Sequence, residues 1–319
     1  MALFAHFRPA ELAALSAIAD ERSVAAGRTV IHKGDTSFDA FVVDRGLVEI
    51  QRQTPYGQFT LAQLGHGHLF GEASFIDSVT RSGDAVTRTE AALIALPSYE
   101  VRALIERDQK VSVALYWTFW KSLSLKLRRT NDQLGRFFAH LPRGDNAAAK
   151  AQRPPTGEFR VDIREKRELF AEQRLSPLEI NFLSSLSRER KLKPGQVLFH
   201  EGDPGDAMYV VLGGRVLISK FIPGAGEEAL AFLERGDYFG EMALIDQAPR
   251  SAQARAHDEG AVVLAIPGEV VNGLLDVHKV SSLPLLKILC ALVTKRLREL
   301  DDKIVGWYIL SGGEAASSI

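Results

Sequence analysis

The chain has 319 residues, of which 46% are hydrophobic and 25% are charged, and these are ordinary values for a soluble globular protein of about two domains. Its formal net charge of −1 gives no electrostatic basis for non-specific binding to nucleic acid or to membranes. The single cysteine, Cys290, excludes an internal disulfide and fits a reducing compartment.

The N-terminal segment does not have the form of a secretory signal, because no basic start precedes an uninterrupted apolar run. No stretch of about 18 uncharged apolar residues occurs in the chain, and the apolar run 283–293 is interrupted by Lys287. We therefore expect a soluble, cytoplasmic protein without a membrane partner.

The first half of the chain begins with a predicted helix and continues as a series of short strands. Leu12, Leu15 and Ile18 recur with a helical period over residues 9–21. The β-type runs that follow occupy residues 29–32, 38–43, 47–53, 58–64, 85–87 and 91–96. Short strands separated by glycine turns are typical of a sandwich or a jelly-roll barrel.

Residues 69–86 interrupt these strands and read L-F-G-E-A-S-F-I-D-S-V-T-R-S-G-D-A-V, with a glycine, a carboxylate and an arginine as landmarks. The tripeptide H-G-H lies just before them at 66–68. We interpret this tripeptide as a solvated turn and predict no metal site, because no third ligand is near it in the sequence. A metal held by the two histidines is the alternative.

Two predicted helices and a linker follow. The first helix covers residues 97–108, and the second covers residues 110–141. The second helix carries one apolar stripe, made of Val111, Leu115, Phe119, Leu123 and Leu127. Segment 142–157 lacks bulky apolar residues and is rich in Ala and Pro, so it predicts a linker between domains of residues 1–141 and 158–319.

The second half of the chain repeats the first after a helical segment whose apolar stripe is predicted at Leu178, Phe182 and Leu186. The repeat is visible in seven landmarks. Gly27, Gly34 and Gly46 recur 168 residues later, and Gly67, Gly71, Glu72 and Arg81 recur 169 residues later. Two copies of this length indicate tandem globular domains, because solenoid repeats are several times shorter.

The second copy of the landmark motif, residues 238–254, reads Y-F-G-E-M-A-L-I-D-Q-A-P-R-S-A-Q-A. Gly240 permits a close approach or a backbone conformation that a Cβ would forbid. Residues 242–245 are long enough for about one helical turn, whose first N–H groups can bind an anion. Arg250 adds a planar charged fork for a phosphate, and Glu241 is suited to accept a hydrogen bond from a sugar hydroxyl. These groups together describe a cyclic nucleotide, and a short helix with a surface ion pair is the alternative.

The pattern F-G-E-x-A-L-x-x-x-x-x-R-S-A resembles, without a gap, the phosphate-binding cassette of cyclic-nucleotide-binding domains, as in catabolite activator proteins and the regulatory subunits of cAMP-dependent protein kinase. The resemblance implies an α+β fold of two jelly-roll β-barrel domains, each flanked by helices and ending in a long helix. It assigns the ribose hydroxyl to the Glu and the cyclic phosphate to the Arg. The implied second site comprises Gly240, Glu241, Met242, Ala243, Arg250, Ser251 and Ala252.

The implied first site comprises Gly71, Glu72, Ala73, Arg81 and Ser82. This copy departs from the family pattern, because Ser74-Phe75 replaces Ala-Leu and Gly83-Asp84 follows the Arg-Ser pair. Phe75 is larger than the usual residue, and we expect Asp84 to compete with a phosphate for Arg81. The first site is therefore expected to bind with a poorer phosphate cradle than the second.

Base contacts are implied by the same resemblance. In catabolite-activator-like proteins a Thr-Ser pair on the helix after the barrel contacts the adenine amino group. The pair aligns on Thr130 and Asn131 in the first copy, which places them in the first site. In the second copy it aligns on Leu300 and Asp301, and Asp301 can accept from an exocyclic amine in the second site. A solvent-facing position of Thr130 and Asn131 is the alternative.

The last predicted helix, residues 285–304, has a heptad seam. The seam consists of Cys290, Val293, Leu297, Leu300, Ile304 and Trp307. Packing on its own barrel and pairing across a homodimer are the two alternatives. In catabolite-activator-like regulators a winged helix-turn-helix follows at this point, whereas residues 307–319 hold no recognition helix, so we expect no nucleic-acid partner.

No nucleophile with a matched base is recognisable, so we do not expect an enzyme. The sequence predicts a receptor with two cyclic-nucleotide sites, for cAMP in preference to cGMP and without a cofactor. Binding is expected to reach a protein effector through the C-terminal helices. A receptor for cGMP or cyclic-di-GMP, and an adaptor with one or both pockets degenerate, are the alternatives.

Overall fold

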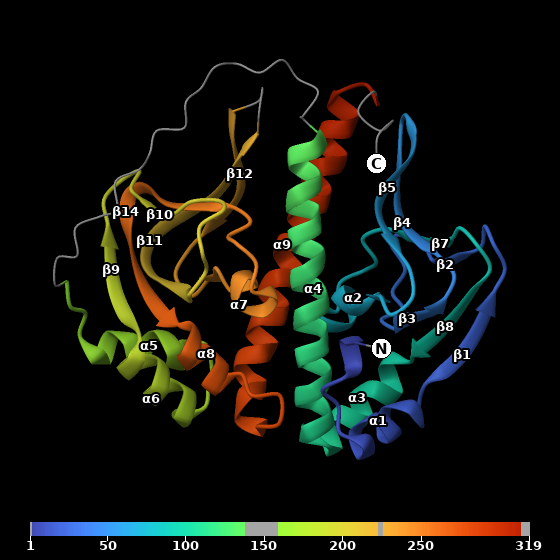
Figure 1. The fold of residues 1–319 in the computed structure, drawn as a ribbon, viewed down its shortest axis with the longest axis horizontal. Coiled ribbons are helices and arrows are strands. Elements are labelled where there is room, and N and C mark those ends of the chain that lie inside the picture. The colour runs from blue at the N-terminus through green and yellow to red at the C-terminus, as the bar shows by residue number, and fades with distance from the viewer. Residues whose placement is uncertain (1, 138–158, 223–225, 314–319) are drawn as a thin grey trace. The chain divides into compact units, whose positions relative to one another are not determined.

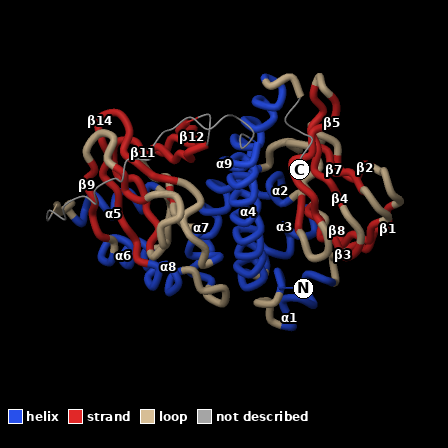
Figure 2. The backbone as a smooth tube through the Cα atoms, turned by 45° about the horizontal axis from the view of Figure 1, so that its top comes forward, coloured by secondary structure: helices blue, strands red, loops and turns tan. Residues whose placement is uncertain are grey.

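The computed structural model describes residues 2–137, 159–222 and 226–313. The chain divides into two compact units: Met1–Lys126 with Val277–Ile319 form unit 1, and Leu127–Asp276 form unit 2. Each unit combines helices with antiparallel strands, so the fold is of the mixed α and β kind (Figure 2). These units divide the chain at other places than the predicted domains do. The predicted linker, 142–157, lies outside the described residues.

Unit 1 contains two four-stranded antiparallel sheets, with strand orders β1-β8-β3-β6 and β2-β7-β4-β5. Their strands are β1 (Asp20–Val24), β2 (Thr29–Ile31), β3 (Ala40–Arg45), β4 (Val48–Thr54), β5 (Gly57–Leu64), β6 (Leu69–Phe70), β7 (Asp84–Thr87) and β8 (Ala91–Leu96). Both sheets are open, so the closed jelly-roll barrel implied by the resemblance is not confirmed.

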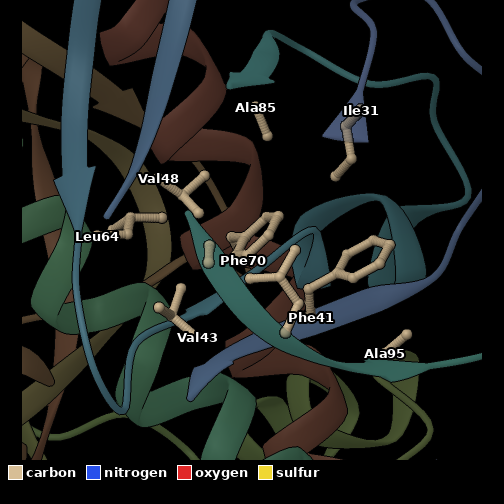
Figure 3. Packing of buried hydrophobic residues seen from close by; sticks show 10 residues of the cluster. Ile31, Phe41, Val43, Val48, Leu64, Phe70, Ala85 and Ala95 are labelled. Carbon is tan, nitrogen blue, oxygen red and sulfur yellow. The ribbon is translucent and has the colours of Figure 1, made fainter. Parts of the chain in front are cut away.

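Alternate side chains from both sheets of unit 1 meet in one core (Figure 3). Phe41 of β3 stacks on Phe70 of β6 with 5.1 Å between ring centroids, and Val43 and Val48 are fully buried beside them. This core lies directly before the first cassette, because Phe70 is the residue that precedes Gly71. Burial of the strand residues therefore fixes where the cassette begins.

Unit 2 contains one six-stranded sheet, with the order β10-β14-β11-β12, in which β13 pairs with β11 and β9 with β14. Its strands are β9 (Arg188–Leu192), β10 (Val197–Phe199), β11 (Ala207–Ile222), β12 (Gly226–Leu233), β13 (Tyr238–Phe239) and β14 (Gln253–Pro267). Strand β11 runs through the region that β3 and β4 occupy in the first copy. Its register with β14 shifts on both sides of Gly213–Gly214.

Helices complete both units (Figure 1). Unit 1 has α1 (Pro9–Ser16), α2 (Glu72–Asp77), α3 (Ser98–Arg107) and α9 (Leu283–Leu310), with short 3-10 turns at Ala2–Phe4 and Val280–Ser282. Unit 2 has α5 (Ile163–Glu172), α6 (Pro177–Leu186), α7 (Met242–Asp246) and α8 (Gly268–Leu274). Helix α4 (Gln109–Phe137) begins in unit 1, and its residues from Leu127 onward belong to unit 2.

Helix α4 buries the whole stripe predicted for it, and α9 buries four of its six seam residues, with Leu297 and Trp307 partly exposed. All five stripe residues of α4 are buried, and so are Cys290, Val293, Leu300 and Ile304 of the α9 seam. Within unit 1, α9 packs against α2 and β4, and the ring of Tyr308 lies 4.6 Å from that of Phe59 on β5. Helix α9 thus belongs to the same unit as the first set of strands. The two predicted alternatives, packing on its own barrel and pairing across a homodimer, did not include this arrangement.

Two predicted helical features are wrong. The helix predicted over residues 9–21 ends at Ser16, and Asp20–Val24 forms β1 because its backbone pairs with β8. On α6 the predicted stripe is exposed: Leu178 is 51%, Phe182 46% and Leu186 44% accessible. The buried face of α6 is instead the one that carries Leu183, which is fully buried.

Candidate functional site

Both cassettes leave a short strand, turn at a glycine and continue into a short helix. Gly71 connects β6 to α2, and Gly240 lies between β13 and α7, with φ values of 82° and 79°. A Cβ on Gly71 would lie 2.6 Å from the carbonyl oxygen of Asp39, and a Cβ on Gly240 would lie 2.7 Å from Nη1 of Arg250. The backbone conformation therefore requires glycine at both positions, and at Gly71 the clash with a backbone carbonyl requires it as well, whereas at Gly240 an added Cβ would displace the Arg250 side chain.

The two cassette arginines are buried and make the same bonds. Arg81 donates from Nη1 to the carbonyl of Gly71 at 2.8 Å and from Nη2 to the carbonyl of Asp39 at 2.6 Å. Arg250 donates from Nη1 to the carbonyl of Gly240 at 2.6 Å and from Nη2 to the carbonyl of Ala207 at 2.7 Å. Each side chain is 4% exposed. The structure thus contains the same arginine cradle twice.

A Gly-Asp turn holds the backbone of each arginine. The Arg81 amide donates to the Asp35 carbonyl at 3.0 Å, and the Gly34 amide donates to the Arg81 carbonyl at 2.9 Å. In unit 2 the same two bonds, both 2.9 Å, join Arg250 to the turn at residues 202–203. The predicted site residues omit these turns, although the recurrence of Gly-Asp before each cassette is a signal that identifies them.

The Nε donor of each cassette guanidinium is unused within the described part of the chain. The Nε atoms of Arg81 and Arg250 are buried and have no hydrogen-bond partner among the described residues. Burial lowers the pKa of both arginines, and this effect outweighs the nearby acidic groups, such as Asp39 beside Arg81 and Asp206 beside Arg250, which raise it. A desolvated cation with a free donor is stabilised by an anion.

A buried carboxylate follows each glycine. Glu72 is 1% exposed, and its Oε1 accepts from the Ser122 hydroxyl at 3.0 Å and pairs with the ammonium of Lys126. Both donors lie on the part of α4 that belongs to unit 1. In unit 2 the equivalent Glu241 is 2% exposed at the start of α7. Each cassette therefore presents a guanidinium and a carboxylate, which suit a phosphate and a hydroxyl.

The unusual Phe75 of the first cassette does not alter its arginine cradle. Its side chain is 1% exposed and packs edge to face against Phe119 of α4, with 5.4 Å between ring centroids. The guanidinium of Arg102 on α3 lies 4.6 Å from the Phe75 ring, a cation–π contact. The larger residue is thus accommodated among the helices of unit 1.

The predicted competition of Asp84 for Arg81 is wrong. The Asp84 carboxylate accepts from the backbone amide of Lys33 at 2.7 Å, whereas Arg81 bonds the carbonyls named above. Close packing explains why residue 83 is a glycine, because a Cβ there would lie 2.9 Å from the carbonyl oxygen of Gln51. Ser82, between Arg81 and Gly83, is partly exposed.

Thr130 and Asn131 lie in unit 2 with the second cassette, contrary to their predicted place in the first site. They are 7% and 5% exposed, which also argues against the solvent-facing alternative. The Nδ2 of Asn131 donates to the hydroxyl of Ser251 at 3.3 Å, and Ser251 directly follows Arg250. Chain order misleads here, because α4 passes from unit 1 to unit 2 before it reaches these residues.

Asp301 lies in unit 1 with the first cassette, contrary to its predicted place in the second site. It is partly buried, and this burial raises its pKa to about 7 against the lowering effects of Arg52, Lys126 and Arg298. Since Lys126 pairs with Glu72, Asp301 belongs to the charged cluster around the first cassette.

The histidines of the H-G-H tripeptide bond to backbone. His66 Nδ1 contacts the carbonyl of Asp44, and His68 Nδ1 contacts that of Gly65 at 3.0 Å. Among residues 2–137, 159–222 and 226–313, no group of three or more His, Cys, Asp or Glu side chains is arranged to hold a metal ion.

Comparison with known families agrees with this twofold geometry. The model of the cyclic nucleotide-binding domain matches residues 21–108 and again residues 189–278, more than half of the chain. The chain belongs to the cyclic nucleotide-binding domain family. The two matches cover both arginine cradles, and they end before the segments of α4 and α9 that carry Asn131 and Asp301.

Two relatives of this family member are named as a receptor protein and as a regulatory subunit. A cyclic AMP receptor protein of Thermus thermophilus is 37% identical over 128 residues, which cover 40% of this chain and 56% of that protein. A cAMP-dependent protein kinase regulatory subunit of Dictyostelium discoideum is 25% identical over 231 residues, which cover 71% of this chain and 57% of that protein. The chain thus spans little more than half the length of either relative.

Among solved structures, the regulatory domain of Toxoplasma gondii PKA with cAMP aligns with 96% of this chain and 92% of its own, at 17% identity and a TM-score of 0.32. The described helices include none that is long and apolar enough to cross a membrane.

Proposed function

We propose that the chain is a cyclic-nucleotide receptor with two binding sites and that its ligand is cAMP. The observation that carries the proposal is the repeated cradle, in which Arg81 and Arg250 are each buried, held by two backbone carbonyls and left with an unused Nε donor. The names of two relatives, a cyclic AMP receptor protein and a cAMP-dependent kinase subunit, support cAMP as the ligand, whereas a third relative is named a cGMP-dependent protein kinase.

In the second site, Arg250 takes the cyclic phosphate and Glu241 takes the ribose 2′-hydroxyl. The backbone of Gly240, Met242 and Ala243, together with Ser251 and Ala252, completes the cradle. Arg81 and Glu72 take the same roles in the first site, with Gly71, Ala73 and Ser82 around them. In the first site Lys126 and Ser122 both contact Oε1 of Glu72, which leaves Oε2 for the hydroxyl.

The base is read differently at the two sites. Asn131, with Thr130 beside it, offers one donor and one acceptor, which match the adenine amino group and a ring nitrogen. The second site is therefore suited to cAMP. At the first site the ionised carboxylate of Asp301 can only accept hydrogen bonds, which suits the N–H donors of guanine. The protonated carboxyl group can also donate one, which suits adenine. Because its pKa is raised to about 7, the first site accepts cGMP more readily than the second.

Ligand binding reaches a protein effector through the long helices. In each unit the sugar-phosphate would contact the cassette while the base contacts a long helix, so a bound nucleotide ties that helix to the cassette. A conformation in which helix and cassette are joined binds the ligand better, and such differential affinity is what a population shift requires.

Calorimetric titration with cAMP, cGMP and cyclic-di-GMP tests the proposal. The wild-type protein should bind two molecules of cAMP, Arg81→Ala and Arg250→Ala one each, and the double variant none. Removing bonds to a charged group costs roughly 1.5–3 kcal/mol each, so each alanine variant should lose more than about tenfold in affinity at its own site.

Arg107→Ala, on the exposed surface of α3, is the matched control and should leave both sites unchanged. Absence of any nucleotide binding would favour the adaptor alternative, and tighter binding of cyclic-di-GMP would replace cAMP as the ligand.

A further inference from the structure

The two long helices carry similar seven-residue segments where they meet a cassette, with Leu, Arg and Asp at the same three positions. Helix α4 reads K-L-R-R-T-N-D at 126–132, and α9 reads R-L-R-E-L-D-D at 296–302. The third position is Arg128 in α4 and Arg298 in α9, and the last position is Asp132 and Asp302. The family model matches neither segment, so these residues are not part of the recognised domain.

In unit 1, Arg298 bonds both ends of the loop that leads to the phosphate-binding arginine. Its Nε lies 2.7 Å from one carboxylate oxygen of Asp77, and its Nη2 lies 3.1 Å from the other. Its Nη1 donates to the carbonyl of Thr80 at 3.2 Å. Asp77 is the last residue of α2, and Thr80 directly precedes Arg81.

In unit 2, Arg128 contacts the corresponding carboxylate and carbonyl. It pairs through Nε with Asp246, the last residue of α7, and its Nη2 donates to the second carboxylate oxygen at 3.1 Å. Its Nη1 donates to the carbonyl of Pro249 at 2.8 Å. Pro249 directly precedes Arg250, so the fork again holds both ends of the same loop.

A second contact accompanies each fork. In unit 1, Arg52 of β4 donates to Asp302 at 2.7 Å. In unit 2, Lys220 of β11 lies 3.6 Å from Asp132 and donates to the carbonyl of Ser251 at 3.3 Å. The helix is therefore joined to the cassette and to the neighbouring strand, and Asp301 or Asn131 lies between the two attachment points along the helix.

We propose that Arg128 and Arg298 are positioning residues for the nucleotide sites, and that each serves the cassette of the other half of the sequence. Arg128, which follows the first cassette in the chain, holds the loop before Arg250. Arg298, which follows the second cassette, holds the loop before Arg81. Each thereby fixes the guanidinium that receives the phosphate. This inference rests on the proposed function.

The forks have the geometry that makes an ion pair effective. Their side chains are 15–20% exposed, each carboxylate is held by two nitrogens, and a backbone carbonyl takes a third. Such partly buried, bidentate pairs are stronger than exposed ones. The pair between Lys295 and Glu299 on α9 is the contrasting case, at 4.0 Å with side chains 70% and 50% exposed.

Two backgrounds separate the sites: Arg81→Ala leaves the second site, and Arg250→Ala leaves the first. In the Arg81→Ala background, Arg128→Ala should weaken cAMP binding about tenfold and Arg298→Ala by less than about twofold. In the Arg250→Ala background the two effects should be exchanged. Lys295→Ala, the matched control on α9, should change neither, and the charge swap of Arg298→Asp with Asp77→Arg should recover part of the lost affinity.

An effect of Arg128→Ala on the first site, or equal effects on both sites, would overturn the proposal. Backgrounds that bind no nucleotide at all would instead disprove the proposed function. Hydrogen exchange of the nucleotide-free protein then still tests the positioning role. Arg128→Ala should speed amide exchange in 242–250 and not in 72–81, and Arg298→Ala should do the reverse. Unchanged exchange in both segments would refute it.

Discussion

Asp301 is predicted to make the protein less stable as the pH rises toward neutrality. Three cations surround it, but each already has a carboxylate partner: Arg52 pairs with Asp302, Lys126 with Glu72 and Arg298 with Asp77. The cluster is therefore neutral without Asp301. Burial is the main cause that raises the pKa of Asp301 to about 7, and Asp302 adds to it, while the three cations, each engaged by another carboxylate, lower it too little to offset the burial.

The sign of the pH effect follows from proton binding. Between the ordinary pKa of 3.8 and the folded value of about 7, the native state holds a proton that the unfolded chain has released. The free energy of unfolding therefore falls as the pH rises through this window and is level above it. One pKa unit corresponds to about 1.4 kcal/mol. With a discount for solvent screening, we expect about 1–2 kcal/mol in all.

The perturbation is Asp301→Asn, which removes the titration. Urea unfolding followed by tryptophan fluorescence should show that the variant gains about 1–2 kcal/mol relative to wild type between pH 4 and pH 8. Glu299→Gln is the control, because this carboxylate on the same helix is half exposed and lies 4.0 Å from its partner Lys295, so its removal should give no such gain. Parallel pH profiles for Asp301→Asn and wild type would refute the reasoning.

Three further predictions concern single positions. Gly240→Ala should lower second-site affinity for cAMP at least about tenfold, because its Cβ would lie 2.7 Å from Nη1 of Arg250. Gly213→Ala is the control, because no atom lies within 4 Å of the added carbon, and it should leave the affinity unchanged. Equal titrations of the two variants would contradict this. Cys290 is fully buried, which raises its pKa, so it should react with Ellman's reagent at pH 8 only after denaturation, and rapid labelling of the native protein would disprove that. Asn131→Ala in the Arg81→Ala background should reduce the preference for cAMP over cGMP about fivefold or more, and an unchanged ratio would show that Asn131 does not read the base.

Local sequence was sufficient to predict the cassettes. The glycine, the carboxylate and the arginine act on one another over about ten residues, so a fixed spacing in the chain becomes a fixed geometry in space. Gly240 and Arg250 show this directly, because the carbonyl of one accepts a bond of 2.6 Å from the other. The limits predicted for strand β8 are confirmed for a similar reason, since the run Ala91–Leu96 is apolar throughout and polar residues precede it.

Features set by distant contacts could not be predicted in this way. The helical period of Leu12, Leu15 and Ile18 continues past Ser16, but pairing with β8 draws Asp20–Val24 into a sheet. On α6 the apolar residues at Leu178 and Phe182 suggested a buried face. The capping box of Ser176 and Glu179 and the contact with α5 instead turn Leu183 inward. In both cases tertiary packing overrides the local pattern.

The assignment of the long helices is the largest difference between sequence and structure, and it has a physical cause. A helix is attached to whichever unit satisfies its charged residues, and adjacency in the chain guarantees only that its first residues lie near the preceding domain. Arg128 pairs with Asp246 and Arg298 pairs with Asp77. The last turns of α4 therefore belong to the unit of the second cassette, and α9 belongs to the unit of the first. The recognised domain ends at residue 108 in one copy and 278 in the other, which leaves both helices outside the pattern that identifies the family. The residues that we propose to contact the base (Asn131 and Asp301) and to hold the phosphate loop (Arg128 and Arg298) therefore lie outside the matched domain. Similarity to relatives does not assign them to a site.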